Sequence, residues 1–418
     1  MQKSAGRILQ EKKAKITKPK NITLLLPAFI FLFSRSSDVY ILQKKESVMK
    51  ITHVISDTNV GGAGVLLTSI LGNLGEDFEF EAILPKNSKL SSLIPKNIRL
   101  TELNVSGDKS FSAADVKTFY NYFKLNTPDI IHTHASLSAR LGAKLAGVKT
   151  ALSTRHCAKV SDRIIKQGPL KRMIYSLSTD ITVSTADFAT QNLIKEGVPC
   201  SRIITIKNGS ADVSRLIENS SFSTHRELGI PENKKIVGSC ARLEKIKGQD
   251  VLLRAVPRVL KEYKDVHFVF VGTGSLADEY KRLSASLGIE NFVTFLGYTD
   301  KPWLYQKDFY INVNSSRGTE TSCLSTSECM ALSIPTVASD FGGNTEMIKH
   351  GENGYIFPSD NPFELSELII KLLKDENIRE NFARSAREYY DKFFSAQRMA
   401  EDYKRLYRSL EFAKSQNV

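Results

Sequence analysis

The sequence has little of what marks several common classes of protein. It contains one Trp and five cysteines, and no two of these thiols form a C-x-x-C pair, so neither a disulfide framework nor a zinc site of ordinary spacing is indicated. An odd number of thiols favours a reduced, cytoplasmic protein. No apolar run reaches the roughly 20 residues that a membrane span needs. With 418 residues, the chain is long enough for two domains that each bury a core.

Positive charge exceeds negative charge, but the excess is concentrated at one end of the chain. The net charge is +13, and residues 1–48 contribute +7 of it, from ten Lys and Arg against three Asp and Glu. The other +6 is modest for the rest of the chain, so no nucleic-acid partner is expected. The same first segment holds the apolar stretch Ile22–Phe33, which Pro27 interrupts.

Beyond residue 48, apolar stretches of strand type alternate with stretches of helical spacing. The predicted strands are 51–56, 78–84, 99–105, 129–133, 150–154, 180–183, 202–206, 235–240, 267–272, 292–296, 309–313 and 336–339. This alternation predicts parallel, doubly wound sheets. The polar stretch 218–224 predicts a linker between two of them. Ligands of such sheets bind at the carboxyl ends of the strands, so a site is expected in the turns that follow them.

Two carboxylates bracket one of these turns and its helix. Glu320 lies in the turn, and Glu328 lies eight residues later in the helix. Unpaired backbone N–H groups at the helix start would bind an anion such as a diphosphate. The residues at that start are Ser322, Cys323 and Leu324. Glu320 could then accept hydrogen bonds from a sugar and Glu328 from a ribose. The run 325–328 also fits a capping box, in which Glu328 would only close the helix start.

A basic turn follows the predicted strand 235–240. Arg242 and Lys247 flank this turn, and a helix begins near Gly248. Fixed cations and a helix N-terminus at such a place would stabilise the charge that builds up on a departing diphosphate. A solvated basic loop is the other interpretation of the turn.

A glycine-rich turn follows the predicted strand 51–56. Its glycines, Gly61, Gly62 and Gly64, would let the backbone approach a ligand closely. The spacing is not the G-x-G-x-x-G of a dinucleotide site, which argues against a nicotinamide cofactor. A plain tight turn is the alternative.

Three histidines lie near the ends of two predicted strands. They are His132, His134 and His156. A metal site is one interpretation of this grouping. No carboxylate joins the histidines at a recognisable spacing, so we expect no metal, and a single histidine at such a place often has a structural role.

Together these turns resemble the retaining family-4 glycosyltransferases. That family has two glutamates with seven residues between them, and an Arg and a Lys shortly after a strand. Here the corresponding residues are Glu320, Glu328, Arg242 and Lys247. The resemblance runs from about Met49 to beyond Asp360. It also rests on DIIHTH at 129–134, KNG at 207–209, VGTG at 271–274, FLGY at 295–298 and DFGG at 340–343.

The sequence departs from the family pattern at two places. Thr321, Ser322 and Cys323 stand where the family commonly has Gly-aromatic-Gly, which would alter how closely the backbone approaches the donor. The Asn-Gly turn also has one residue more than usual before Asp212. Neither change removes a carboxylate of the pair.

The resemblance implies the GT-B architecture, an α/β fold of two Rossmann-like, doubly wound domains that face a cleft. We expect an acceptor domain at 49–215, a nucleotide-sugar domain at 216–390, and a helix at 391–418 that returns to the first domain. The implied reaction transfers a sugar from a nucleotide diphosphate sugar to an acceptor hydroxyl with retention. It needs no metal or other cofactor.

The resemblance also assigns roles to individual residues. Arg242 and Lys247 would stabilise the leaving diphosphate, Glu320 would bind the donor sugar, and Glu328 would bind the ribose. His134 would contact the sugar from the first domain, where Gly61, Gly62 and Gly64 would face the sugar and the phosphate. Backbone at Gly272 and Tyr298 would line the pocket for the base, and Gly342, Gly343 and Glu346 would form its floor.

Two other functions stay open. A sugar-nucleotide epimerase or a phosphorylase would have the same fold. A non-catalytic subunit that binds nucleotide sugars would be expected to have lost Glu320, Arg242 or Lys247, and all three are present. The sequence does not name the donor sugar, the base or the acceptor. Family habit favours a bacterial surface polysaccharide or glycolipid pathway, with a sugar or a lipid-linked sugar as acceptor.

Two segments bear on membrane contact. Met49 begins a strand typical of this family, so we expect 1–48 to be an extension that is disordered or not native, with translation starting at Met49. If that extension is translated, its basic and apolar composition favours contact with an anionic membrane surface. The predicted helix 161–178 mixes basic and apolar residues as well. It would either touch a membrane-borne acceptor or present an ordinary solvated face.

Overall fold

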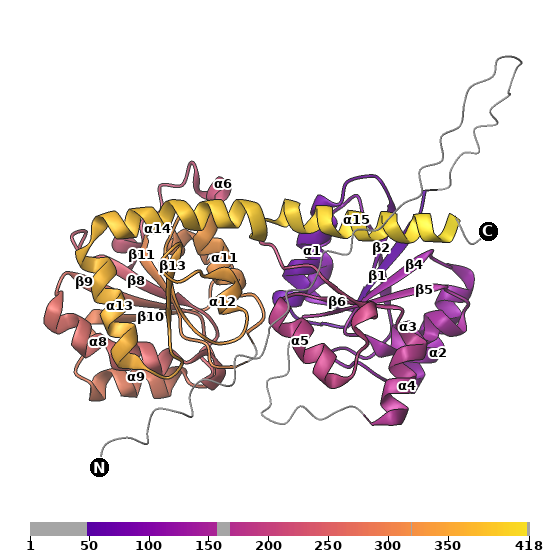
Figure 1. Ribbon diagram of the computed structural model, residues 1–418, viewed down its shortest axis with the longest axis horizontal. Coiled ribbons are helices and arrows are strands. Elements are labelled where there is room, and N and C mark those ends of the chain that lie inside the picture. The colour runs from indigo at the N-terminus through magenta and orange to yellow at the C-terminus, as the bar shows by residue number, and fades with distance from the viewer. Residues whose placement is uncertain (1–47, 157–167, 319, 416–418) are drawn as a thin grey trace, which may run out of the picture. The chain divides into compact units, whose positions relative to one another are not determined.

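The structure is a computed structural model that describes residues 48–156, 168–318 and 320–415 (Figure 1). Residues from Val48 onward belong to one compact unit. The expected extension lies outside the described residues except for Val48, and so does the first part of the helix predicted at 161–178.

The first lobe is built on a seven-stranded parallel sheet with the strand order β3-β2-β1-β4-β5-β6-β7. The strands are β1 (Lys50–Ile55), β2 (Glu79–Pro85), β3 (Arg99–Leu103), β4 (Ile130–His134), β5 (Thr150–Arg155), β6 (Ile181–Ser184) and β7 (Ile203–Thr205). The helices between them include α1 (Gly62–Asn73), α2 (Ala113–Leu125), α3 (Leu137–Leu145), α4 (Pro169–Ser178) and α5 (Asp187–Glu196). The strand order reverses at β1 and β4.

The second lobe is built on a six-stranded parallel sheet with the order β10-β9-β8-β11-β12-β13. The strands are β8 (Lys235–Cys240), β9 (Val266–Val271), β10 (Val293–Gly297), β11 (Phe309–Asn314), β12 (Thr336–Ser339) and β13 (Gly354–Phe357). Its helices include α8 (Gln249–Glu262), α9 (Ala277–Ser286), α10 (Trp303–Gln306), α11 (Leu324–Ala331), α12 (Asn344–Met347), α13 (Pro362–Lys374) and α14 (Glu376–Tyr389). Here the order reverses at β8 and β11.

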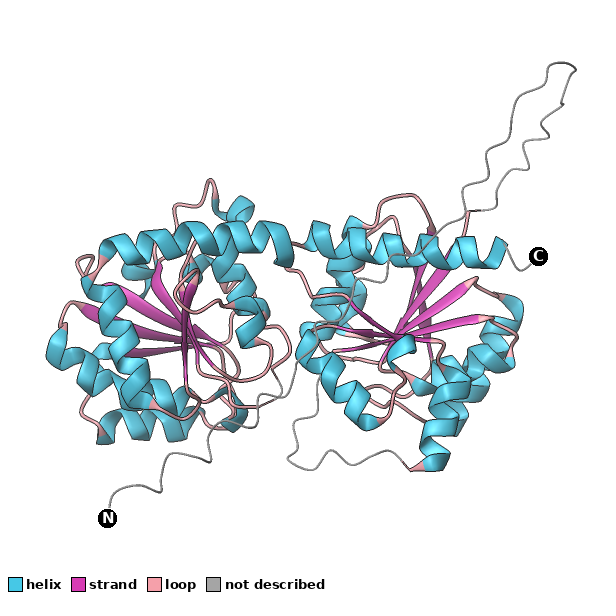
Figure 2. Ribbon diagram, viewed as in Figure 1, coloured by secondary structure: helices cyan, strands magenta, loops and turns pink. Residues whose placement is uncertain are grey.

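The two sheets confirm the fold predicted from the alternation of strand and helix patterns. Helices pack against the sheets (Figure 2), so the central strands are near-continuous apolar runs. Every residue of β9 is buried, for example. The prediction missed β13, because this strand has only four residues and precedes a strong helix signal. Leu252 of α8 and Ile369 of α13 pack with Phe268 of β9 in the core of this lobe.

The chain passes between the lobes at two places that are hydrogen-bonded to each other. The N–H of Ser210 donates to the carbonyl of Phe394 (2.9 Å), and the N–H of Ala396 donates to the carbonyl of Ser210 (2.8 Å). Beyond this bridge, helix α15 (Ala396–Ser415) runs along the first lobe (Figure 1). Its Met399, Tyr403 and Tyr407 are buried in the core of that lobe. The C-terminal helix thereby fastens the end of the chain to the first lobe.

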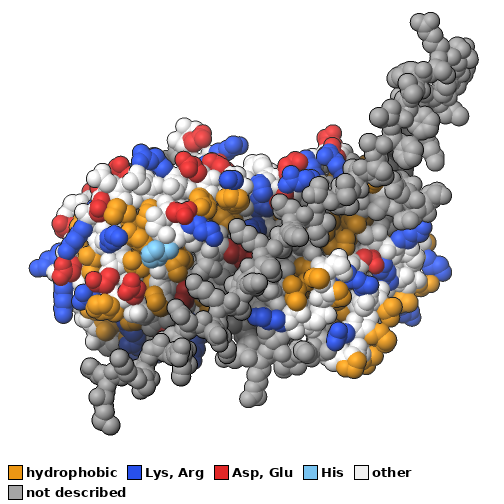
Figure 3. All heavy atoms as spheres, viewed as in Figure 1, with side chains coloured by type: hydrophobic (Ala, Val, Ile, Leu, Met, Phe, Trp, Pro, Cys, Tyr) orange, Lys and Arg blue, Asp and Glu red, His pale blue; other side chains and the backbone are white. Residues whose placement is uncertain are grey.

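The described surface carries charges of both signs. On the face shown in Figure 3, Lys and Arg side chains are interspersed with Asp and Glu and with apolar side chains. Among the helices of the described ranges, none is both long and apolar enough to cross a bilayer.

The bridge between the lobes gives a test of stability. Gly209 precedes it, and a Cβ atom at this position would lie 2.2 Å from the carbonyl oxygen of Ser395. We predict that Gly209→Ala lowers the free energy of unfolding by about 1–3 kcal/mol, because backbone must shift to make room. Gly72→Ala is the control, because a Cβ there meets nothing closer than 3.9 Å. Chemical denaturation of both variants checks this, and equal stability of both would contradict it.

Candidate donor site

An ion pair joins the loops that follow β8 and β11. Nζ of Lys247 lies 2.6 Å from Oε2 of Glu320, and the two side chains are 16% and 6% exposed. The loops after β8 and β11 lie side by side because these strands are neighbours where the strand order reverses. The structure thus brings together two of the predicted site residues that are 73 positions apart.

The Glu320 loop is held from two sides. The hydroxyl of Ser316 donates to the same carboxylate oxygen (2.8 Å), and the N–H of Gly343 donates to the carbonyl of Glu320 (3.1 Å). A Cβ on Gly343 would lie 1.6 Å from the carbonyl oxygen of Thr321, so only glycine fits there. The DFGG turn at 340–343 therefore supports the backbone of the Glu320 loop.

A second cation, Arg242, lies near Lys247, the positively charged member of this ion pair. Burial alone would lower the pKa of Lys247, but the Glu320 carboxylate outweighs it and leaves that pKa raised. Arg242 is close enough that its charge opposes this rise. Lys247 therefore stays protonated at neutral pH, and together with Arg242 it gives the loop after β8 a double positive charge. Such a pair suits a diphosphate.

Helix α11 begins at Leu324 with Cys323 as its N-cap residue, and no side chain caps it. The capping-box interpretation of 325–328 is therefore wrong, because the helix starts before Ser325. Glu328 lies inside the helix, where burial raises the pKa of its carboxyl to about 7. The hydroxyl of Ser322 is buried with no hydrogen-bond partner. The helix start thus offers free backbone N–H groups and an unpaired hydroxyl to a ligand.

The three glycines of the turn after β1 have different roles. Gly61 is the N-cap residue of α1, and it is exposed, as is Gly62. A Cβ on Gly62 would lie 3.9 Å from the side chain of Leu324, so this turn faces the start of α11. Gly64 is buried, and a Cβ there would lie 2.3 Å from the side chain of Leu90. Gly64 is needed for packing and does not face a ligand.

Gly272 and Tyr298 lie at the ends of neighbouring strands. The N–H of Gly272 donates to the carbonyl of Gly297 (2.8 Å), and the φ angle of Gly272 is +131°. A Cβ on Gly272 would lie 2.2 Å from the carbonyl oxygen of Ala241, which precedes Arg242. Tyr298 is 74% exposed. Gly272 therefore borders the turn that carries Arg242 and Lys247, and Tyr298 follows the strand next to it. The contact of either residue with a base stays a prediction.

Contacts between the lobes reach this site. The hydroxyl of Thr321 donates to the carbonyl of His156 (3.0 Å). The Glu346 carboxylate accepts from the N–H groups of Asp187 (3.0 Å) and Phe188 (2.8 Å), which begin helix α5. Glu346 therefore caps a helix of the first lobe. The expectation that it forms the floor of the base pocket is not supported by this geometry.

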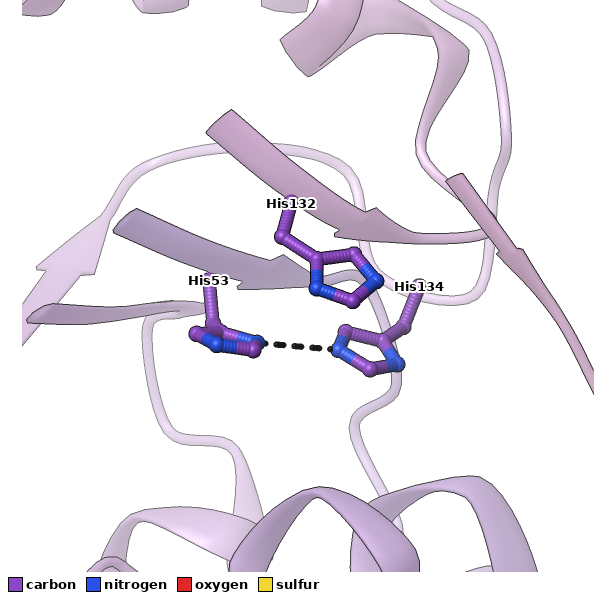
Figure 4. A group of neighbouring side chains, drawn as sticks. All are labelled: His53, His132 and His134. Carbon is purple, nitrogen blue, oxygen red and sulfur yellow. Dashed lines mark hydrogen bonds between the residues drawn. The ribbon is translucent and has the colours of Figure 1, made fainter. Parts of the chain in front are cut away.

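A buried group of histidines lies where β1 and β4 pair. His53 of β1 faces His132 and His134 of β4 (Figure 4). Nδ1 of His53 lies 3.2 Å from Nε2 of His134, and Nδ1 of His134 lies 2.8 Å from Nε2 of His156. His134 is 1% exposed. The sequence did not indicate His53, because a lone histidine in a strand carries no signal of its own.

These distances change the interpretation of His134. It lies at the end of β4 as expected, but both of its ring nitrogens are occupied by other histidines, so neither is free to contact a sugar. His156 ends this series, and its Nδ1 is buried with no hydrogen-bond partner among the residues that the structure describes. Its backbone carbonyl is the one that Thr321 binds, next to Glu320. His156 is therefore the imidazole of this series with an unpaired nitrogen, and its backbone lies next to the Glu320 loop.

Three of these histidines have the composition of a metal site. The candidate ligand atoms of His53, His132 and His134 all lie within 4.8 Å of one another. Burial lowers the pKa of His53 to about 3, so the ring is neutral, as a ligand must be. Both nitrogens of His132, however, make hydrogen bonds of 2.7 Å, to Tyr407 and Thr154. A metal would have to displace one of them.

Comparison with known proteins agrees with this geometry. Residues 220–389 match the family described as Glycosyl transferases group 1. Spore coat protein SA of Bacillus subtilis is 35% identical over 192 residues, which cover 43% of this chain and 50% of that protein. N-acetyl-alpha-D-glucosaminyl L-malate synthase of Bacillus anthracis is 26% identical over 379 residues, which cover 84% of this chain and 94% of that protein.

Solved structures show the same architecture. A glycosyltransferase from Rickettsia africae ESF-5 superimposes with a TM-score of 0.74 at 18% identity, covering 87% of this chain and 98% of its own. Anabaena Alr3699/HepE in complex with UDP superimposes with a TM-score of 0.72 at 20% identity, covering 86% of this chain and 100% of its own. The chain has the GT-B fold, and its residues 220–389 match the group 1 glycosyltransferase domain. The family resemblance read from the glutamate pair is thus confirmed for the second lobe.

The raised pKa of Glu328 predicts a pH dependence of stability. The folded glycosyltransferase holds this proton more tightly than the unfolded chain, so the stabilisation is full below pH 4.5 and is lost as the pH rises through about 7. Glu328→Gln cannot titrate. Between about pH 5 and pH 8, wild type should lose on the order of 2 kcal/mol relative to this variant. Denaturation at both pH values measures the difference, and parallel curves would show that Glu328 does not titrate in this range.

Proposed function

We propose that this glycosyltransferase moves a hexose from a nucleotide diphosphate sugar to an acceptor hydroxyl with retention at the anomeric carbon. The buried Lys247–Glu320 pair carries this proposal, because it puts a fixed cation and a fixed carboxylate at one point next to a free helix N-terminus. The cation suits the diphosphate, and the carboxylate suits the sugar hydroxyls attached to it. The HepE structure contains UDP, so uridine diphosphate sugars are the first donors to test.

The chemistry follows from where charge develops. As the bond from the anomeric carbon to the diphosphate breaks, negative charge grows on the leaving oxygens. Lys247, Arg242 and the N–H groups at the start of α11 are positioned to stabilise that charge without moving. Glu320 accepts hydrogen bonds from the sugar, and Glu328 from the ribose. In the same-face route of this family, the acceptor proton passes to the leaving phosphate, and no resident metal is required.

The first lobe contributes His156. The backbone carbonyl of this residue accepts a hydrogen bond from Thr321, next to Glu320, and the turn with the exposed Gly61 and Gly62 faces the start of α11. Residues of both lobes would therefore contact the nucleotide sugar. Burial lowers the pKa of His156 to about 4, so the ring acts as a neutral hydrogen-bonding group.

Helix α4 is the candidate contact surface for the acceptor. Its Leu170, Met173 and Leu177 are all more than half exposed and follow helical spacing. Arg172 lies among them and is exposed as well. This surface suits a lipid-linked sugar presented at an anionic membrane, so we place the protein in the cytoplasm with peripheral membrane contact. A role in bacterial surface polysaccharide or glycolipid synthesis follows from such an acceptor.

Lys247→Ala tests the donor site. We predict that it lowers kcat by about 100–1,000-fold, because a group that stabilises transition-state charge is lost. It should also abolish the rise in melting temperature that the nucleotide diphosphate causes in wild type. Lys235→Ala is the matched control. Lys235 is similarly withdrawn from solvent and pairs with Glu376 at 3.5 Å, outside the site. It should retain activity.

Product analysis separates the rival functions. Proton NMR of the product should show that the anomeric configuration of the donor is kept. A product formed without any acceptor other than water, with an altered sugar stereocentre, would instead identify an epimerase. Activity only with phosphate would identify a phosphorylase. Nucleotide-sugar binding without turnover of any donor would favour a non-catalytic subunit.

His156 and His134 should respond differently to truncation. We predict that His156→Ala lowers kcat/KM by about 100-fold with little change in melting temperature, because only the end of the histidine series is removed. His134→Ala should lower the melting temperature, because it leaves a hole among buried histidines. Steady-state kinetics and thermal denaturation of both variants check this. Full activity of the His156→Ala variant would show that His156 does not belong to the donor site.

A further inference from the structure

The histidines of the first lobe belong to a longer series that begins on the C-terminal helix. Oη of Tyr403 lies 3.4 Å from Oγ1 of Thr154, which lies 2.7 Å from Nε2 of His132. Nδ1 of His132 lies 2.7 Å from Oη of Tyr407, which lies 3.2 Å from Nε2 of His53. The contacts of His53 with His134, and of His134 with His156, complete the series. Seven side chains thus form a single file from α15 to the donor site.

Two arrangements of protons use every hydroxyl of the file as a donor within it. A neutral imidazole has one N–H donor and one acceptor nitrogen, and a hydroxyl has one proton. A hydroxyl that accepted from both neighbours would leave its own proton buried and unpaired, which is costly. When every hydroxyl donates within the file, all members donate in the same direction. In one arrangement all four histidines carry the proton on Nδ1, and in the other they all carry it on Nε2. Burial favours the neutral ring throughout, since it lowers the pKa of each of these histidines.

The two ends of the file decide between the two arrangements. Tyr403 is 1% exposed, and its hydroxyl has Thr154 as its hydrogen-bond partner among the described residues. In the direction from His156 to Tyr403, the hydroxyl proton of Tyr403 would be buried without an acceptor, which is costly. In the direction from Tyr403 to His156, the unpaired proton is the one on Nδ1 of His156, which has no partner among the described residues. An oxygen of a bound ligand can accept this proton, so ligand binding makes the file donate from Tyr403 toward His156.

We propose that this file holds His156 as the Nδ1–H tautomer, so that it donates a hydrogen bond to an oxygen of the bound donor sugar. Tyr403, Tyr407, His53 and His134 are then positioning residues that act through His156. Part of this inference rests on the proposed function, because the ligand oxygen belongs to the nucleotide sugar. With the ligand bound, only this tautomer leaves no proton of the file unpaired.

Correlated ¹⁵N and ¹³C NMR of the histidine-labelled full chain tests the tautomer directly. The sequence has seven histidines, and single His→Gln variants assign their signals. We expect Nδ1–H signals for His53, His132, His134 and His156 with a nucleotide sugar bound. Nε2–H signals at these four would overturn the proposal. Stoichiometric zinc or another metal in the purified protein, bound through His53 and His134, would also overturn it, because no proton would then lie between them.

Tyr407→Phe tests whether the members are coupled. It removes one hydroxyl in the middle of the file and keeps the ring. We expect His156 to change from a single tautomer to a mixture, although three links separate it from Tyr407, and kcat to fall about 3–10-fold with nucleotide binding unchanged. Tyr390→Phe is the matched control, because it also removes a buried hydroxyl that makes a hydrogen bond (2.9 Å, to the carbonyl of Ser210).

The outcomes separate the two proposals. A change confined to His53 and His132 in Tyr407→Phe would show that the members are not coupled. A change of the His156 signals in Tyr390→Phe as well would show a general effect of destabilisation, and either result overturns the inference. If the four histidines show the expected tautomers but the protein turns over no nucleotide sugar, the inference about the tautomers is supported and the proposed function is contradicted.

Discussion

The reversal of strand order in each sheet is the constraint on which the donor site depends. Parallel strands on either side of such a point send their connections to opposite faces, so the two loops diverge and leave room for a ligand. In the second lobe these strands are β8 and β11, and their loops supply Lys247 and Glu320. In the first lobe they are β1 and β4, which supply the exposed glycines and the histidines. The chemistry is thus concentrated at two equivalent points of two similar sheets.

The loops at these points are held by backbone that admits no side chain. Gly248, which follows Lys247, has a φ angle of +65° and would clash with the carbonyl of Ser315 if it had a Cβ. Gly343 has the same relation to Thr321. These glycines let the loops after β8, β11 and β12 pack on one another at backbone distance. Glycines lose more conformational entropy on folding than other residues. Here this cost is offset because the glycines allow the close packing that fixes the charges of Lys247 and Glu320.

The sequence predicted the fold and the second lobe of the site well, for a physical reason. Strand runs, helix starts and the turn residues are local patterns, and the glutamate pair lies within one turn and one helix. The helix start predicted near Ser322 agrees with the observed start of α11 at Leu324, whereas the alternative, a capping box at 325–328, is wrong because Cys323 precedes the helix without a capping side chain. The four-residue β13 was missed because so short a strand carries almost no periodicity.

The first lobe was harder to predict, because there the important relations are between strands. Whether His134 has a free nitrogen depends on His53, which is 81 positions away, and on His156 at the end of the next strand. No local pattern contains this information. Burying a histidine nitrogen without a hydrogen-bond partner is unfavourable. Several buried histidines on adjacent strands therefore tend to form hydrogen bonds with one another. Only the last member of such a series keeps a nitrogen for a ligand. In this series that member is His156 rather than His134, and the tyrosines of α15 make hydrogen bonds at the other end.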